Sequence, residues 1–397
     1  MAIGRVPPGS QSSLREANRA RILDTIKRLG AMTQVELADA TGLSTATVSI
    51  IVNELAAAGI VTTTQVTRSG RRAFQVTLSR GLGLVAGIHF STRALIVALS
   101  DPNGSIIAKQ RLPLPADHRH DTDMDRAAQL IADMLESISA PPSELLGAGL
   151  GICAPYNPKT DMLSVPGLLR GWDEVHIAES MSRRLGKPVV VDNGANLAML
   201  GESRHGIAKE AQSAVFVSIG HGIGAGILAN GEILRGYDGT AGEIGHVRVL
   251  ENGDLCHCGN RGCLEVMVNS TTIVNSLRNT VGNVTLRDVI TMARQGDIGC
   301  SRVISDAAHY VGGALSALCN LVNPELIVIG GELADAGVAL LAPLEAAIER
   351  NSLHNPLNPP RVQLSILGED AAVYGAAAFA FDSISLPISS VMMEASA

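Results

Sequence analysis

The sequence predicts an α/β protein in which a small basic helical module precedes a larger acidic body. Residues 1–80 carry ten Lys/Arg and five Asp/Glu, a net charge of +5, and the remainder carries 21 and 33, a net charge of −12. From Gly83 onward, apolar strand-like runs alternate with Ala-rich helical runs, and several of the strand-like runs end in glycine. This alternation is typical of α/β proteins. The charge division indicates that the first part alone meets a polyanion.

The length and composition exclude several classes of protein. At 397 residues the chain has room for two or three domains. It contains no apolar run of 18 residues, and its N-terminus has neither a signal nor a transit pattern. We therefore expect a cytoplasmic protein without a membrane partner. Aromatic residues make up 3% of the chain, which argues against a stacking platform for single-stranded nucleic acid.

The first module is expected over 14–80, after a disordered tail over 1–13 that is rich in Gly, Pro and Ser. Apolar residues recur at helical spacing over Asn18–Leu29, which predicts a first helix. Thr33-Gln34-Val35-Glu36 is a capping box, and it predicts the start of a second, short helix.

A third helix is predicted after the turn at Gly42. Ser44 is its expected N-cap, and its inner face is formed by Val48, Ile51, Val52 and Leu55. Strands are predicted over Val61–Thr64 and Phe74–Leu78, with a basic hairpin tip over 67–72. Two short helices about a glycine turn, followed by such a hairpin, are typical of a winged helix-turn-helix domain.

Short polar side chains on the third helix suit base edges in double-stranded DNA, and arginines at the hairpin tip suit phosphates or a narrow minor groove. The residues expected to contact DNA are Ser44, Thr45, Thr47, Ser49, Asn53, Arg68, Arg71 and Arg72. The alternative is an αα-hairpin that binds protein and carries solvated charges on a loop. The wing, the charge division and the terminal position together favour DNA.

The body is predicted to contain two similar halves. Leu84–Gly104 and Ser213–Gly231 each read as a strand, a turn, a second strand and a turn ending in Asn-Gly. Two such lobes would face a cleft, where α/β folds place their ligands. The glycine-rich turn over 220–224 lies within the second half, and taken alone it could equally be a plain hairpin. A final helix is predicted to begin near Ala371.

The stretch Gly239–Glu265 is the most informative part of the body. Cys256, Cys258 and Cys263 form a C-x-C-x4-C pattern, and His246 lies ten residues ahead of it. Three thiolates and one imidazole make a full tetrahedral set for a structural zinc ion. The alternative is three small buried thiols beside a solvated histidine. Half of the six cysteines fall within eight residues, which favours a metal in a reducing compartment.

Taken together, these motifs resemble the ROK family (repressors, open reading frames and kinases), which includes bacterial glucokinases and the xylose and N-acetylglucosamine repressors. The likeness extends from residue 14 to the C-terminus. Its most specific parts are A-G-E-I-G-H at 241–246 and C-H-C-G-N-R-G-C-L-E at 256–265. L-S-T-A-T-V-S at 43–49 is similar to the winged helix of bacterial repressors.

The resemblance implies an actin-like (ribonuclease H-like) pair of lobes of the sugar-kinase type, with sugar bound in the cleft of a dimer or of a dimer of dimers. The first lobe would span about 81–194 together with a C-terminal helix at about 378–397, and the second lobe about 195–377. The implied zinc ligands are His246, Cys256, Cys258 and Cys263. The residues implied to lie around a sugar-like effector are Gly167, Asn193, Glu243, His246 and Glu265.

Two departures from the family pattern indicate that the chain is not a kinase. Kinases of the family carry an aspartate as general base where this chain has Gly194. At the first phosphate turn, the aspartate and paired glycines of the kinases are replaced within His89-Phe90-Ser91-Thr92. Phosphoryl transfer depends on positioning and charge neutralisation, so both losses should abolish it.

A third departure concerns sugar recognition, because Gly167 replaces an asparagine that would bond a sugar hydroxyl. The sequence therefore predicts a sugar-responsive repressor that binds a pseudo-palindromic operator. The alternatives are an active ATP-dependent sugar kinase with a DNA-binding arm, and a DNA-binding regulator with a vestigial cleft.

Overall fold

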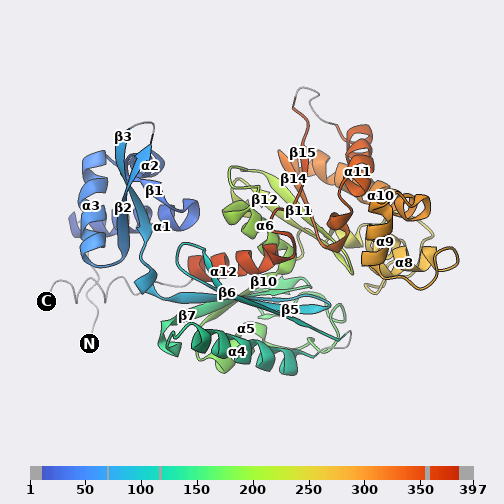
Figure 1. Ribbon diagram of the computed structural model, residues 1–397, viewed down its shortest axis with the longest axis horizontal. Coiled ribbons are helices and arrows are strands. Elements are labelled where there is room, and N and C mark those ends of the chain that lie inside the picture. Colours follow the sequence, from blue (N-terminus) through green and yellow to red (C-terminus); the bar gives the residue numbers. More distant parts are fainter. Residues whose placement is uncertain (1–10, 69–70, 116–118, 354–357, 384–397) are drawn as a thin grey trace.

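A computed structural model of the protein describes residues 11–68, 71–115, 119–353 and 358–383. Three units follow one another through the molecule: the N-terminal module, a first lobe and a second lobe (Figure 1). Within the described residues no single helix is long and apolar enough to cross a membrane. One bent pair, Gln34–Thr41 with Thr45–Ala57, passes that test jointly, by length and composition.

The N-terminal module is a three-helix winged fold, as predicted. Its elements are α1 (Gln11–Leu29), β1 (Met32–Thr33), α2 (Gln34–Thr41), α3 (Thr45–Ala57), β2 (Val61–Arg68) and β3 (Arg71–Leu78), with strand order β1-β3-β2. The Thr33 capping box and the Ser44 N-cap are both confirmed. The helix α1 begins at Gln11, so three residues of the expected tail are helical, and 1–10 lie outside the described residues.

The two long strands of the module form the predicted wing. They pair in antiparallel register from Val61 opposite Leu78 to Arg68 opposite Arg71, and residues 69–70 between them lie outside the described part. Both strands extend further toward the tip than the sequence predicted. Continued ladder pairing explains this, because each added residue satisfies backbone groups of the opposite strand.

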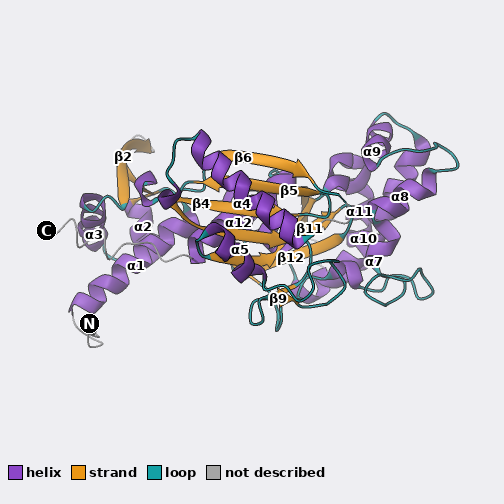
Figure 2. Ribbon diagram, turned by 90° about the horizontal axis from the view of Figure 1, so that it is seen from below, coloured by secondary structure: helices purple, strands orange, loops and turns teal. Residues whose placement is uncertain are grey.

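The first lobe is a mixed sheet covered by helices on both faces. Its elements are η1 (Arg80–Leu82), β4 (Leu84–Phe90), β5 (Ala94–Ser100), β6 (Ile106–Pro113), α4 (His120–Ser137), η2 (Pro142–Glu144), β7 (Leu145–Ile152), β8 (Tyr156–Asn157), β9 (Met162–Leu163), α5 (Ile177–Leu185), β10 (Val189–Asn193) and α6 (Gly194–His205). The helices α4 and α5 cover one face of the sheet (Figures 1 and 2).

The second lobe contains the other five-stranded sheet and a large helical region. Its elements are β11 (Ala214–Ile219), β12 (Ile223–Ala229), β13 (Glu232–Ile233), η3 (Ile244–His246), α7 (Leu264–Val268), α8 (Ser270–Leu277), α9 (Leu286–Arg294), α10 (Ile298–Val322), β14 (Leu326–Gly330), η4 (Glu332–Ala336), α11 (Val338–Asn351), β15 (Arg361–Leu364) and η5 (Gly368–Asp370). The last described helix, α12 (Ala371–Ser383), returns to the first lobe and packs on the opposite face from α4 and α5 (Figure 1).

The two sheets repeat one topology, which bears out the duplication inferred from the sequence. Their strand orders are β6-β5-β4-β7-β10 and β13-β12-β11-β14-β15. In each sheet the first three strands pair antiparallel, the central strand pairs parallel with the fourth, and the fourth pairs parallel with the fifth. The glycine turn of the second lobe is shorter than predicted, spanning 220–222, because Ile223 and Gly224 already pair with β11.

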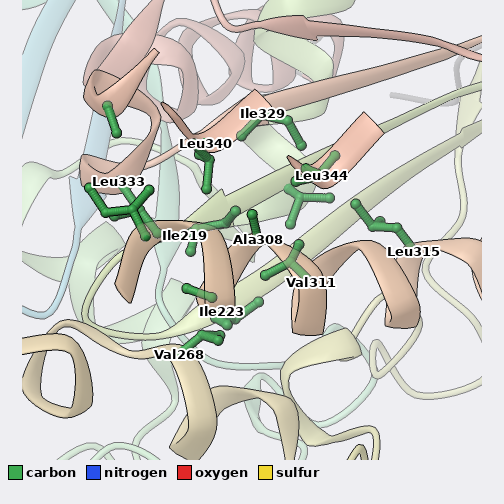
Figure 3. Close-up of a cluster of buried hydrophobic side chains, with 14 of the residues drawn as sticks. Ile219, Ile223, Val268, Ala308, Val311, Leu315, Ile329, Leu333, Leu340 and Leu344 are labelled. Carbon is green, nitrogen blue, oxygen red and sulfur yellow. The ribbon is translucent and has the colours of Figure 1, made fainter. Parts of the chain in front are cut away.

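Each lobe has its own apolar core. In the second lobe, Ile219 and Ile223 from the sheet pack with Val268, Val311 and other side chains from the helices (Figure 3). These two isoleucines flank the glycine turn, so its ends are fixed by burial. The C-terminal helix begins at Ala371, as predicted, which is seven residues ahead of the lobe boundary expected at about 378. Residues 384–397 lie outside the described residues.

Candidate functional site

A cavity of about 550 Å³ is lined by residues of both lobes, at the ends of the strands. Its wall includes most of the predicted effector site: Asn193, Glu243, His246 and Glu265. The exposed Gly167 does not line it; its neighbours Leu168 and Leu169 do. The backbone N–H of Gly167 donates to Asp173 Oδ1 at 2.8 Å, which holds this loop at the rim.

The four predicted metal ligands converge beside this cavity. Cys256 Sγ lies 3.6 Å from His246 Nδ1, and Cys258 Sγ lies 3.7 Å from Cys263 Sγ. Their donor atoms all lie within 4.8 Å of one another. Zinc bonds of about 2.3 Å to sulfur and about 2.0 Å to nitrogen place two sulfurs about 3.8 Å apart and sulfur and nitrogen about 3.5 Å apart in a tetrahedron. The four side chains therefore fit a tetrahedral metal ion.

Backbone hydrogen bonds explain why the cysteine loop closes on itself. The N–H of Cys256 donates to Asn260 O at 2.7 Å, and the N–H of Gly259 donates back to Cys256 O at 2.9 Å. The N–H of Leu264 donates to Val247 O at 2.8 Å, which joins the loop to the segment that carries His246. Gly259 has a φ of +91°, a conformation that glycine adopts without steric cost.

The carboxylate of Glu265 is fixed at both oxygens. Its Oε2 accepts from the backbone N–H of Ile223 at 2.9 Å, and its Oε1 lies 3.3 Å from Nδ1 of His257. The ring of His257 also meets that of His246 edge-on, with centroids 5.3 Å apart. His257 lines the cavity, so it belongs to the site although the sequence did not predict it. Its position between two cysteine ligands was the available signal.

Glu243 lines the same cavity as Glu265, close enough to be influenced by its charge. Burial, together with the nearby Glu265 carboxylate, raises the pKa of Glu243 to about 7. Its Oε1 accepts a hydrogen bond of 3.1 Å from the side-chain amide of Asn193, the N-cap of α6. The amide thus joins the first lobe to the second across the cavity.

The space beside Gly194 is occupied by a histidine ring. A Cβ built on Gly194 would lie 2.7 Å from Nε2 and 3.3 Å from Cδ2 of His89. Burial lowers the pKa of His89 to about 4, so the ring is neutral. Its Nδ1 has no hydrogen-bond partner among the described residues. The imidazole therefore fills the space that a side chain at position 194 would enter.

The turn between β4 and β5, which the sequence predicted as an altered phosphate turn, is closed by its own serine. Ser91 Oγ accepts from the backbone N–H of Ala94 at 2.9 Å and from that of Arg93 at 3.4 Å. The Ser91 backbone N–H donates to Ala94 O at 2.9 Å. These N–H groups are the donors that a phosphate-binding turn would direct at its ligand. In this chain they are used within the turn.

In the N-terminal module, α3 has the predicted division of faces. Val48, Ile51, Val52 and Leu55 are buried, whereas Ser44, Thr45 and Asn53 are exposed and Thr47 and Ser49 are half-buried. Ile50 is 57% exposed between them, a residue that the sequence analysis missed. An apolar side chain on a recognition helix can contact a thymine methyl group. Arg72 is exposed on the wing.

The chain thus combines a winged helix-turn-helix domain with a two-lobed, actin-like body that carries a cysteine loop at its cleft. The description "ROK family" matches residues 85–383, and "MarR family" matches residues 16–72. The chain belongs to the ROK family.

Two relatives and one solved structure show how much of the chain is similar to known proteins. A xylose repressor of Bacillus subtilis (strain 168) is 26% identical over 374 residues, covering 94% of this chain and 97% of that protein. A glucokinase of Halalkalibacterium halodurans is 32% identical over 306 residues, covering 73% and 92%. The crystal structure of a ROK family transcriptional regulator, a homologue of the Escherichia coli Mlc protein, superposes with a TM-score of 0.75 at 24% identity, covering 96% and 99%. The fold therefore extends over nearly the whole of this chain.

Proposed function

We propose that this protein is a DNA-binding repressor whose cleft binds a sugar or sugar derivative without phosphorylating it. Relatives with this full-length architecture include the xylose repressor, whereas the glucokinase corresponds to 73% of this chain. The chain carries the winged helix in addition to the two lobes. A regulator of this kind acts on DNA in the cytoplasm.

The observation that carries the proposal is the contact between His89 and Gly194. In the kinases of the family an aspartate at this position is the general base, and a base must come within about 3 Å of the proton it removes. Here position 194 has no side chain, and the neutral His89 ring fills the adjacent space. The Ser91-closed turn supports the same conclusion, since it leaves fewer N–H donors for a triphosphate.

For the effector we propose hydroxyl recognition by Glu243, Glu265, His246 and the amide of Asn193. Carboxylate and imidazole groups accept hydrogen bonds from hydroxyls, and an amide both donates and accepts. His257 would hold Glu265 in place through the 3.3 Å contact. Each such bond contributes on the order of 1 kcal/mol net, so several must act together for useful affinity.

For the cysteine loop we propose a structural zinc ion held by His246, Cys256, Cys258 and Cys263. The separations of 3.6 and 3.7 Å match the edges of a zinc tetrahedron. An ion held by four protein ligands has no open position for a reacting molecule, so its role would be to fix His246 and Glu265 beside the cavity.

For DNA we propose that two copies bind a pseudo-palindrome, each placing α3 in a major groove and its wing on the flanking backbone. Half-sites about 34 Å apart would match two such modules on a two-fold axis. Lobe closure around the effector would then change the separation of the modules, and effector and DNA affinities would be coupled reciprocally.

A capture experiment tests the proposal. Genomic fragments retained by the purified chain are sequenced, and the Kd for a recovered fragment is measured with D-xylose, D-glucose, N-acetyl-D-glucosamine, a sugar phosphate and an acidic sugar. We expect a palindromic motif and a change in Kd of at least about fivefold with one class. ADP release with the same sugars should stay at the blank level.

The alternatives give different results in the same assays. Steady ADP release with any sugar would establish the kinase with a DNA-binding arm. A Kd unaffected by every compound would instead favour a regulator with a vestigial cleft. Failure to retain any genomic fragment would contradict the DNA-binding role.

A further inference from the structure

Two helices connect the cleft with the DNA-binding module. The N-cap Asn193 and the first residues of α6, Gly194 and Ala195, line the cleft cavity. So do the first residues of α12, Ala371 and Ala372. The last residues of both helices, including Arg204 and Asp382, line a separate cavity of about 380 Å³ against the end of α1. With 12 and 13 residues, they span about 18–20 Å at 1.5 Å per residue.

The two helices are in backbone contact along this path. A Cβ on Gly375 of α12 would lie 1.7 Å from Leu197 O of α6, and one on Gly201 of α6 would lie 2.2 Å from Ala371 O. Glycines on both helices therefore permit an approach that other residues would prevent. Helices packed this closely move as one body, because no flexible side-chain layer separates them.

At the far end, the last described turns of α1, α6 and α12 meet, and their side chains contact one another's helices. Arg204 of α6 donates through Nη1 to Lys27 O in the last turn of α1 at 3.2 Å, and its Nη2 lies 2.7 Å from Asp382 Oδ2 of α12. Lys27 of α1 donates to Phe381 O of α12 at 3.4 Å, and its ammonium lies 5.1 Å from the Phe381 ring centroid. Each cation thus satisfies a terminal carbonyl of a neighbouring helix. We call Lys27, Arg204, Phe381 and Asp382 the junction cluster.

The basic character of this second cavity follows from the same arrangement. Lys27, Arg28, Arg204 and Lys209 line it, against Asp101 and Asp382, and Asp101 is paired with Arg80. The C-termini of α1 and α6 each contribute about half a negative charge. The cations therefore balance the helix ends. Burial lowers the pKa of Lys27 and of Arg204 and raises that of Asp382, which agrees with a shielded cluster.

The module is also attached to the body by apolar and backbone contacts around the junction cluster. Ile22 and Ile26 of α1 share one apolar core with Val85 of β4 and with Ala380 and Phe381 of α12. The side-chain amide of Asn103 pairs with both backbone groups of Leu78, at 3.0 and 2.9 Å. The module is therefore packed against the body rather than tethered to it.

We propose that α6 and α12 act as a rigid strut that carries lobe movement to the DNA-binding module, with Lys27, Arg204 and Asp382 as its coupling residues. The inference extends the proposed function, since it assigns residues to the coupling that a sugar-responsive repressor requires. Removing the Arg204 side-chain bonds should leave the cleft and α3 intact. The cleft should then no longer respond to DNA binding, nor α3 to a ligand in the cleft.

The decisive variant is Arg204→Met, which keeps the apolar stem and removes the donors. The matched control is Arg184→Met, which breaks an Arg–Asp contact with Asp125 of the same kind, 2.6 Å long, between α5 and α4. Hydrogen exchange over residues 193–198 is measured for each protein, free and bound to a DNA fragment captured by the wild type. Binding of DNA should change exchange at this cleft end at least about fivefold in the wild type and the control, and less than about twofold in Arg204→Met.

The hydrogen-exchange experiment requires no sugar, so it tests the strut even if the protein does not bind sugar. Where a sugar of the panel does shift the wild-type Kd, Arg204→Met should bind that sugar normally by calorimetry and should lose most of the shift. A variant that loses DNA binding altogether would be replaced by Asp382→Asn, which weakens the same contact. Equal coupling in the wild type and both variants would overturn the strut, as would a wild type whose cleft does not respond to DNA.

Discussion

Asp192 at the end of β10 accepts a hydrogen bond of 2.7 Å from Nε of Arg235, which follows β13 in the second lobe. The Asp192 side chain is only 6% exposed, and its other oxygen accepts from the Asn196 amide at 2.9 Å. Asp192 precedes Gly194 by two residues. Both oxygens of Asp192 are therefore engaged, and its ion pair with Arg235 links the two lobes.

Replacing the guanidinium partner tests this structural role. Arg235→Met should lower the free energy of unfolding by about 1–3 kcal/mol, because it leaves a buried carboxylate oxygen without its donor. Urea denaturation measures the change. Arg294→Met, on the exposed end of α9, provides the control and should alter stability by less than about 0.5 kcal/mol. Equal stabilities would show that the contact between Asp192 and Arg235 contributes little.

A side chain at position 194 should conflict with His89. Gly194→Ala places a Cβ 2.7 Å from Nε2 of the ring, and overpacking of this kind costs about 1–3 kcal/mol. Gly194→Ala should therefore cost less stability in the His89→Ala background than in the wild type. Unfolding free energies of the four proteins give the coupling directly. Additive losses would mean that the ring does not restrict position 194.

The cysteine loop should require its metal for stability. Cys258→Ser should release the ion and lower the melting temperature, because metal binding at a structural site contributes to the folding free energy. Metal content by mass spectrometry and thermal unfolding measure both effects. Cys300→Ala, a buried thiol of α10 outside the cluster, should keep the full metal content. Unchanged metal in Cys258→Ser would refute the ligand assignment.

The wing should contribute through phosphates. Arg71→Ala/Arg72→Ala should weaken binding to every captured fragment and reduce the slope of log K against log salt by about one for each arginine in contact. Fluorescence titrations at several salt concentrations provide the slope. Arg302→Ala, on α10 of the second lobe, should leave it unchanged. Loss of affinity at a single base position would instead assign these arginines to base recognition.

Local chemistry explains what was predictable in this chain. The Thr33 capping box, the Ser44 N-cap and the cysteine ligand set depend on residues near one another in sequence, and the structure brings each set together. The repeated strand-turn-strand pattern was likewise predictable, since both halves contain a turn that ends in Asn-Gly. Such features are fixed by spacing.

The position of His89 beside Gly194 could not be predicted from local spacing, because it depends on the register of three strands. His89 lies opposite Gly151 of β7, and Gly151 lies opposite Asp192 of β10, so the ring reaches the start of α6 over a residue without a side chain. His257 was missed for a related reason. His257 and Glu265 come within 3.3 Å of each other only when the cysteine loop has folded.

The apolar core shared by α1, β4 and α12 has a consequence for exchange of parts between related proteins. The sequence divides at about residue 80, yet Ala380 and Phe381 near the end of the chain complete the core of the N-terminal module. A foreign DNA-binding module grafted at that division would meet a surface shaped for another partner. A swap of DNA specificity therefore requires Ala380 and Phe381 of α12 to be exchanged together with the module.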